Sequence, residues 1–297
     1  MRKVKKAVIM AGGFGTRFLP ITKVIPKEML PIEDKPIIQY IVEECIASNI
    51  EEILIITNED KSSIKNYFLP NLELEQNLKD NNKEAILKSL EYLSNLNVRV
   101  YKQSIDEISL GDGYGLKIAK DFIGNDDYFA LLWGDDLMDN ENYPVLKQLI
   151  DMHEKTNANV IAVKTVAKED AHKYGMISYK AKNLIERIVE KPNNEDTPSL
   201  DAGIGRYILS RNLFWELDHI EPNNYGAYQT VKAIDKLMLK EDFYACKFQG
   251  NYYDIGNKIG YLKAIIDYGL KNEEIRQYIL DKIKEFWYEL FLIIFST

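Results

Sequence analysis

The sequence has 297 residues, of which 46% are hydrophobic and 28% are charged, and its formal net charge is -8. This composition is typical of a globular protein with one large domain or two ordinary ones. The acidic balance argues against a general nucleic-acid-binding protein, because such proteins usually carry a basic face. A local basic pocket for a phosphorylated small molecule is compatible with it.

The first predicted elements alternate between strand and helix. Residues 5–11 form a short apolar run between charges and glycines, which predicts a buried strand, and the run is too short for the hydrophobic region of a signal peptide. Residues 36–48 place apolar side chains at helical spacing, with Pro36 suited to the first turn. Residues 52–57 predict a second buried strand, and a polar helical stretch follows at 59–95.

Further strands are expected at 97–103 and 127–136. Strands that alternate with helices and are apolar nearly throughout predict a parallel sheet covered on both faces. Shorter and more closely spaced strands, which suggest a mixed sheet and hairpins built onto the first half, are expected at 160–166, 176–179, 185–192, 203–210 and 243–257. From about residue 258 onward the pattern is helical.

These elements predict an α/β fold. Its centre is a Rossmann-like mixed, mostly parallel sheet flanked by helices, and to this are added a smaller β region and a C-terminal helical tail.

The loop after the first strand indicates phosphate binding. Gly12, Gly13 and Gly15 follow that strand, at the edge of the sheet where open α/β proteins bind ligands. Glycines let backbone N–H groups approach an anion closely, although a structural turn would also use them. Arg17 and Lys27 lie close behind and supply cations that can neutralise a triphosphate. Loop and cations together favour phosphate binding.

Several motifs resemble those of one enzyme family. They are GFGTRFLP at 13–20, TKVIPKEMLP at 22–31, DKPIIQY at 34–40, VEKP at 189–192, GRY at 205–207 and DIGNKIGY at 254–261. On these motifs the chain resembles the sugar-1-phosphate nucleotidyltransferases, and among them the bacterial UTP–glucose-1-phosphate uridylyltransferases. The resemblance runs over nearly the whole chain.

The resemblance implies an in-line attack by a glucose 1-phosphate oxygen on the α-phosphorus of UTP, assisted by Mg²⁺, which gives UDP-glucose and pyrophosphate. It implies one nucleotidyltransferase α/β domain at 1–257, with a nucleotide-binding half at about 1–136 and a sugar-binding half at about 137–257. A C-terminal helical segment would occupy 258–297. The enzyme would be cytoplasmic.

The resemblance also implies a role for individual residues. Arg17 and Lys27 would be catalytic, and Asp135 and Asp254 would bind the metal. The expected nucleotide-binding residues are Ala11, Gly12, Gly13, Gly15, Thr16, Gln103, Gly111 and Gly113. The expected sugar-phosphate-binding residues are Gly175, Glu190 and Lys191. The alternatives are a turn or helix cap for Asp135, a solvated side chain for Lys27, and an exposed strand edge for Glu190 and Lys191.

Three stretches depart from the family pattern. The loop after Gln103 is three residues longer, is acidic, and carries Tyr114 where the family has His. In the segment expected to close over the sugar, Ala227 and Lys232 replace two carboxylates. Before the strand that carries the GRY motif, Leu200 replaces an amide that would contact the sugar. The phosphate half of the pattern is kept while the sugar half is altered, which leaves the base and sugar specificity open.

Four functions are therefore considered. The first is an active uridylyltransferase that makes UDP-glucose, and the second is the same reaction with another sugar 1-phosphate or another nucleoside triphosphate. The third is a non-catalytic relative that binds a nucleotide or sugar nucleotide and regulates a partner. The fourth, a dinucleotide-dependent oxidoreductase, fails on its glycine spacing because position 18 is Phe.

The remaining expectations concern surroundings and partners. Cys45 and Cys246 show no ligand spacing and are expected to be reduced core thiols. Residues 285–297 are aromatic and apolar but too short to span a bilayer, so no integral membrane segment is expected. This tail is expected to be an amphipathic helix packed on the body or on a second subunit, with a membrane-surface contact as the alternative. The resemblance implies a homodimer or homotetramer.

Overall fold

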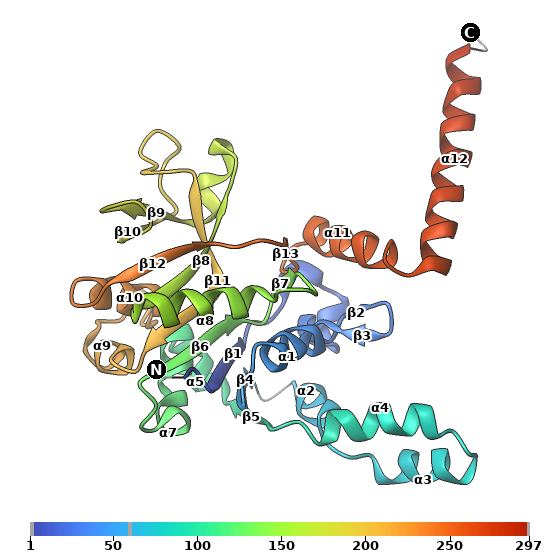
Figure 1. Cartoon of the computed structure of the whole chain (residues 1–297), viewed down its shortest axis with the longest axis horizontal. Helices are drawn as coiled ribbons and strands as arrows, with labels where there is room; N and C mark the ends of the chain where they lie inside the picture. The colour runs from blue at the N-terminus through green and yellow to red at the C-terminus, as the bar shows by residue number, and fades with distance from the viewer. Residues whose placement is uncertain (1–2, 59–60, 296–297) are drawn as a thin grey trace.

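The computed structural model of the chain describes residues 3–58 and 61–295, and their side chains as far as residue 288 (Figure 1). Four parallel strands, in the spatial order β6-β1-β4-β5, form one side of a nine-stranded sheet, with β5 at its edge. They are β1 (Lys6–Ala11), β4 (Glu52–Asn58), β5 (Val98–Gln103) and β6 (Tyr128–Trp133). The predicted parallel sheet is confirmed.

The carboxyl ends of these strands determine where a site can form. Because the strands run in parallel, the segments that follow β1, β5 and β6 meet at one edge of the sheet. The glycine loop, Gln103 and Asp135 belong to these segments.

The second half of the chain extends the sheet with antiparallel pairs. β11 (Asp201–Ser210) lies antiparallel to β6, and it also pairs with β8 (Asn159–Thr165) and β9 (Gly175–Tyr179). β9 pairs with β10 (Ile185–Glu190), and β8 pairs in parallel with β12 (Phe243–Lys247). The expected mixed extension is therefore present.

The region 243–257, expected as one strand segment, forms strands in two different sheets. β12 ends at Lys247, and the chain turns at Gly250, whose φ of 133° favours glycine. β13 (Asn251–Asp254) then pairs with β7 (Asp136–Asp139) in a separate two-stranded sheet. In this register Asp254 lies opposite Asp136, which brings two distant acidic segments together.

The helices differ from the prediction at their boundaries. α1 (Ile37–Ala47) has Pro36 as its N-cap, so the placement of Pro36 in the first turn is wrong by one position. The predicted stretch 59–95 contains three helices, α2 (Ser62–Tyr67), α3 (Leu72–Asp80) and α4 (Glu84–Ser94). Figure 1 shows α3 and α4 as a pair that extends away from the sheet.

The other elements connect the strands. The remaining α-helices are α5 (Ile105–Ser109), α6 (Asp112–Lys117), α7 (Ala119–Ile123), α8 (Val145–Thr156), α9 (Leu213–His219), α10 (Thr230–Met238), α11 (Lys258–Gly269) and α12 (Glu273–Phe295). Short 3-10 turns lie at Thr16–Phe18, Ile21–Lys23, Lys27–Met29 and Lys168–Lys173, and β2 (Pro31–Ile32) pairs with β3 (Lys35–Pro36).

The core has one layer on each face of the sheet. Successive residues of a strand point to opposite faces, so Ile9 packs in the layer with α1 and α8 while Val8 packs in the layer with α9 and α10. Cys45 and Cys246 are free and buried in the first of these layers, as predicted.

The C-terminal helix α12 extends away from the body (Figure 1). Its exposed side chains include Tyr278, Phe286 and Trp287. The side chains of 289–297, part of the predicted tail, lie outside the described residues. Over the described residues, no helix has both the length and the apolar character needed to cross a membrane.

Candidate functional site

The glycine loop after β1 is held in place through its carbonyl oxygens. Gly15 adopts a left-handed conformation with φ of 66°, and the Thr22 hydroxyl donates a hydrogen bond to its carbonyl at 2.8 Å. Asn58 Nδ2 donates to the carbonyl of Gly12 at 3.2 Å. A Cβ on Gly15 would lie 3.1 Å from Thr22 Cγ2, so both the conformation and the space favour glycine.

A cavity of 280 Å³ opens beside this loop. Of the residues predicted to bind nucleotide or metal, its wall includes Gly12, Gly13, Lys27, Gln103, Gly111 and Asp135. Ala11, Gly15, Thr16, Arg17, Gly113 and Asp254 do not line this cavity. The structure thus brings half-buried cationic and acidic groups together with a glycine-rich backbone.

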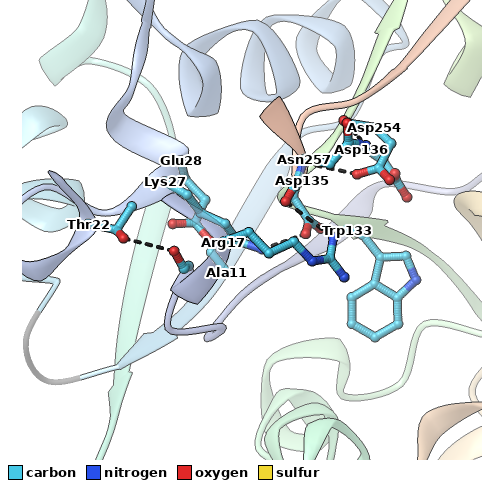
Figure 2. Close-up of polar contacts among 12 residues, drawn as sticks. Ala11, Arg17, Thr22, Lys27, Glu28, Trp133, Asp135, Asp136, Asp254 and Asn257 are labelled. Atoms are coloured by element: carbon cyan, nitrogen blue, oxygen red, sulfur yellow. Dashed lines mark hydrogen bonds and ion pairs between the residues drawn. The ribbon is translucent and has the colours of Figure 1, made fainter. Parts of the chain in front are cut away.

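Lys27 and Asp135 form an ion pair in the cavity wall (Figure 2). Lys27 Nζ donates a hydrogen bond to Asp135 Oδ2, and the Lys27 side chain is only 14% exposed. Burial lowers the pKa of Lys27, but the charges of Asp135 and Glu28 outweigh this effect and leave the pKa raised. Lys27 is therefore a fixed cation at neutral pH, and its reading as a solvated lysine is wrong.

Two carboxylates and a guanidinium converge on Gly256. A Cβ on this glycine would lie 2.9 Å from Asp135 Oδ2, 3.0 Å from Asp254 Oδ1 and 3.3 Å from Arg17 Nη1. Arg17 Nη1 donates a hydrogen bond to the carbonyl of Gly256 at 3.2 Å (Figure 2). The close approach explains why the residue is glycine, and it places the two predicted metal ligands beside each other.

The donor set at Asp135 and Asp254 fits Mg²⁺. This ion is commonly bound by one or two carboxylates and completes its shell with water and substrate phosphates. In the described part of the chain, no group of three or more His, Cys, Asp or Glu side chains is arranged to hold a metal by itself. A metal held here would therefore take its further oxygens from water and from a phosphorylated ligand.

Arg206 fixes the backbone on both sides of Asp135. It is fully buried, and its Nε and Nη2 donate to Glu44 Oε2 at 3.1 and 2.8 Å. Its Nη1 donates to the carbonyl of Trp133 at 3.4 Å, and its Nη2 donates to that of Asp136 at 2.9 Å. These contacts hold the segment from β6 to β7 and so orient Asp135 between them.

The neighbouring Asp136 points into the protein. Its carboxylate accepts hydrogen bonds from the Tyr252 hydroxyl at 2.8 Å and from the N–H of Gly205 at 3.1 Å. Burial, together with the charge of Asp135, raises the pKa of Asp136 to about 7. Within the acidic doublet, Asp136 is thus structural while Asp135 lines the cavity.

We expect Gly205→Ala to destabilise the protein strongly. A Cβ at this position would lie 1.9 Å from Asp136 Oδ2 and 2.5 Å from Trp133 Cδ1, so the β6–β7 segment would have to move. The expected loss in the free energy of unfolding is about 1–3 kcal/mol or more, measured by urea denaturation. Gly203→Ala on the same strand is the control, because its Cβ would meet no atom nearer than 3.5 Å. Equal stability of the two variants would contradict this packing.

A buried ion pair that sequence reasoning missed lies beneath the glycine loop. Lys61 Nζ donates to both carboxylate oxygens of Glu28, at 3.0 and 2.8 Å, and to the carbonyl of Ala11 at 2.7 Å. The side chains are 6% and 0% exposed. Burial raises the pKa of Glu28 and lowers that of Lys61, while each partner's charge opposes the shift of the other. The pair anchors the end of β1, where the glycine loop begins.

Gln103 closes the inner end of the cavity. It is the last residue of β5, its side chain is buried, and its Nε2 has no hydrogen-bond partner within the described residues. Its amide lies 3.2 Å from the place of a Cβ on Gly12 and 3.1 Å from that of one on Gly115. A buried, unpaired amide donor is costly, and a ligand carbonyl would satisfy it.

The longer loop after Gln103 forms helix α5. Ser104 and Glu107 make a capping box at its start, with the Glu107 carboxylate accepting from the N–H of Ser104 at 2.7 Å. The added acid of Glu107 is thus used by the helix itself.

Two of the three predicted sugar-phosphate residues lie around a second cavity of 260 Å³. Gly175 and Glu190 line it and face each other across the β9–β10 pair. Lys191 follows with a positive φ of 45° and its Nζ lies 3.4 Å from Glu190 Oε1, but it does not line this cavity.

The two cavities share a wall. Asp112 and Trp133 line both of them, and the loops on either side are joined by backbone hydrogen bonds. The N–H of Tyr228 donates to the carbonyl of Leu110 at 2.7 Å, and the N–H of Gly113 donates to the carbonyl of Tyr228 at 3.0 Å. A ligand that filled both cavities would run past Asp112 and Trp133.

Comparison with known proteins gives consistent results. The chain matches the nucleotidyl transferase family over residues 6–269. A UTP–glucose-1-phosphate uridylyltransferase of Streptococcus pyogenes is 44% identical over 284 residues, covering 93% of this chain and 94% of that protein. One of Staphylococcus epidermidis is 41% identical over 292 residues, covering 96% and 99%. A UTP-bound UGPase from Acinetobacter baumannii superimposes with a TM-score of 0.85 at 32% identity, covering 95% of this chain and 99% of that chain.

Proposed function

Since this chain belongs to the nucleotidyl transferase family, we propose that it transfers a uridylyl group from UTP to glucose 1-phosphate. The products are UDP-glucose and pyrophosphate. The observation that carries the proposal is the adjoining pair of cavities, one bordered by the glycine loop, Lys27 and Asp135, the other by Gly175 and Glu190. The two relatives that share 41–44% of its residues support the choice of substrates.

The reaction brings two polyanions together, so the site has to supply positive charge and fixed geometry. A phosphate oxygen of the sugar attacks the α-phosphorus of UTP in line with the leaving pyrophosphate. In the proposal, Gly12, Gly13 and Gly15 present backbone N–H groups to the phosphates, with Ala11 and Thr16 at the two ends of the loop. Lys27 stabilises the charge that develops on the α-phosphoryl oxygens, and Arg17 draws the phosphates toward the same side.

The base and the sugar occupy opposite sides of the shared wall. We assign the uracil to Gln103, Gly111 and Gly113, and the sugar phosphate to Gly175, Glu190 and Lys191. This division corresponds to a nucleotide-binding half at about 1–136 and a sugar-binding half at about 137–257.

Asp135 and Asp254 would hold Mg²⁺ in this proposal. The ion would neutralise phosphate charge and favour the in-line geometry when bound. The convergence of both carboxylates on Gly256 supports this assignment.

A panel of substrates tests the function. Pyrophosphate release is measured with Mg²⁺ and UTP, using glucose 1-phosphate and other sugar 1-phosphates, and then with glucose 1-phosphate and other nucleoside triphosphates. We expect the fastest release with UTP and glucose 1-phosphate, and its loss when EDTA removes the metal. Faster release with another sugar would favour the second candidate, a transferase with a changed sugar, which the substitutions Ala227 and Lys232 motivate.

We also propose that the protein is a cytoplasmic homodimer or homotetramer that uses α12 as an interface. Free, buried Cys45 and Cys246 support a reducing compartment. Phe286, Trp287 and Tyr288 are 61%, 63% and 65% exposed, and exposed apolar patches commonly mark interaction sites.

Trp287→Glu is expected to weaken this association, because a buried aromatic anchor commonly contributes about 2 kcal/mol or more to an interface. Light scattering across a concentration series would then show a lower mass at low concentration than for the wild type. Lys65→Glu, which changes the charge at an exposed residue of α2, away from α12, is the control. A wild-type mass equal to one chain at all concentrations would contradict the proposal.

A further inference from the structure

Asp112 occupies a position that none of the roles assigned above explains. It is the first residue of α6, and it lines the nucleotide cavity and the sugar cavity alike. Both cavities are expected to hold phosphate groups, which accept hydrogen bonds and repel a carboxylate. An acidic residue at this junction therefore needs a partner that donates.

The carboxylate is fixed through one of its oxygens. Asp112 Oδ2 accepts a hydrogen bond from the N–H of Thr230 at 3.2 Å, at the first residue of α10, and the nine-residue helix adds a favourable dipole. This bond turns the side chain toward the sugar cavity, which Gln229 and Thr230 also line. Since an ionised carboxylate accepts up to about four hydrogen bonds, most of its acceptor capacity remains.

A side-chain group without a hydrogen-bond partner lies next to Asp112. Thr230 is only 1% exposed, and its buried hydroxyl has no hydrogen-bond partner within the described residues. A buried hydroxyl without a partner is costly. Its presence beside Asp112, in the same cavity wall, indicates that polar ligand groups complete this corner.

The backbone around Asp112 is also rigid. Gly111, with φ of 89°, and Gly113 pack against the backbone of Tyr228, where a Cβ would lie 2.5 and 3.0 Å from its carbonyl oxygen. The hydrogen bonds between Tyr228 and the Leu110–Gly113 segment hold the residues on either side of Asp112. The carboxylate is thus preorganised, as a recognition group should be.

We propose that Asp112 is a specificity-determining residue that accepts a hydrogen bond from a ring hydroxyl of the sugar 1-phosphate. The inference rests on the proposed function, because it takes the second cavity as the sugar site. Phosphates offer acceptors only, so the donors that the substrates offer are the sugar hydroxyls, the ribose hydroxyls and the uracil N–H. The hydrogen bond from Thr230 turns Asp112 toward the sugar cavity, which favours a hydroxyl of the sugar 1-phosphate.

The test compares the wild type with Asp112→Ala, using glucose 1-phosphate and its 2-, 3-, 4- and 6-deoxy analogues. We expect one deoxy analogue to lower the wild-type kcat/KM about 10- to 100-fold, in line with a hydrogen bond to a charged group. Asp112→Ala should lower kcat/KM for glucose 1-phosphate by a similar factor. For that deoxy analogue, Asp112→Ala and the wild type should have the same kcat/KM. The KM for UTP should change less than about twofold, since the contact is with the sugar.

Two further variants separate recognition from folding. Asp106→Ala removes the same charge from an exposed position on α5 that lines neither cavity, and should behave as the wild type. Asp112→Asn keeps an oxygen for the N–H of Thr230, so it preserves this hydrogen bond while it removes the charge. An equal loss with every analogue, or a rise in the KM for UTP, would overturn the proposal.

Failure of the proposed function can be distinguished from failure of the inference about Asp112. If the wild type released no pyrophosphate from any pair of substrates, the transferase assignment would be wrong, and binding would decide the role of Asp112. UDP-glucose should then bind the wild type about 10-fold more tightly than Asp112→Ala, with UDP affinity unchanged. Equal UDP-glucose affinities would overturn the inference.

Discussion

Lys27→Ala is expected to lower kcat for pyrophosphate release by about 100- to 1,000-fold, the usual effect of removing one preorganised group that stabilises transition-state charge. The reason is the position of its ammonium group in the cavity wall, paired with Asp135 and held as a cation. Because its charge acts on the transferring phosphoryl group, the KM for UTP should change much less than kcat. Steady-state kinetics with both substrates at saturation measures the effect.

Lys65→Ala is the matched control, because Lys65 is an exposed lysine on α2 outside both cavities. Asp135→Asn should also lose turnover, and the double variant should be little worse than either single one, since the two groups act as a unit. Full activity of Lys27→Ala would remove Lys27 from the chemistry and leave the ion pair as a structural contact.

Lys61→Met is expected to lower the free energy of unfolding by about 3–5 kcal/mol, because removing one partner of a buried pair leaves the other charge uncompensated. Glu28, 0% exposed, would lose its closest cation, and the carbonyl of Ala11 would lose a hydrogen bond. Urea denaturation measures the change. The glycine loop would be disturbed as well, so the KM for UTP should rise.

The double variant Lys61→Met/Glu28→Leu distinguishes a paired charge from general packing. Replacing both ions by apolar groups should recover much of the stability, because no unpaired charge remains. Arg99→Ala is the control for a surface pair, since its contact with Glu52 is largely exposed and should contribute less than about 1 kcal/mol. A loss for Lys61→Met no greater than for Arg99→Ala would show that the buried pair is unimportant.

The fold could be predicted where local pattern and tertiary role agree. β1 and β4 are apolar over most of their length because both faces of the parallel sheet are covered, so the expected strands at 5–11 and 52–57 match within a residue. The two-stranded β7–β13 sheet could not be predicted, because strands of four residues carry too little pattern and depend on a long-range pairing. Helix α8 was also absent from the predicted elements, although its apolar residues recur at helical spacing.

The residues of the candidate site also differ in how well the sequence predicts them. Gly15 and Lys27 lie within continuous motifs of the sequence. In the structure Lys27 lines the nucleotide cavity, and Gly15 lies in the turn that supports it. Lys61 follows a polar run in the sequence and reads as a solvated lysine. Its burial depends on Glu28 from a different turn and on the end of β1, neither of which is adjacent in the sequence. Contacts made across the fold carry no local signal.

The measurement that tests the central claim most directly follows a label on the α-phosphate of UTP. The purified protein is incubated with this UTP, glucose 1-phosphate and Mg²⁺, and the products are separated. We predict that the label appears in UDP-glucose, in amounts equal to the unlabelled pyrophosphate released, and that neither product forms without the sugar phosphate. Label that stays in UTP while UDP-glucose binds to the protein would contradict uridylyl transfer and indicate a nucleotide-sugar-binding regulator.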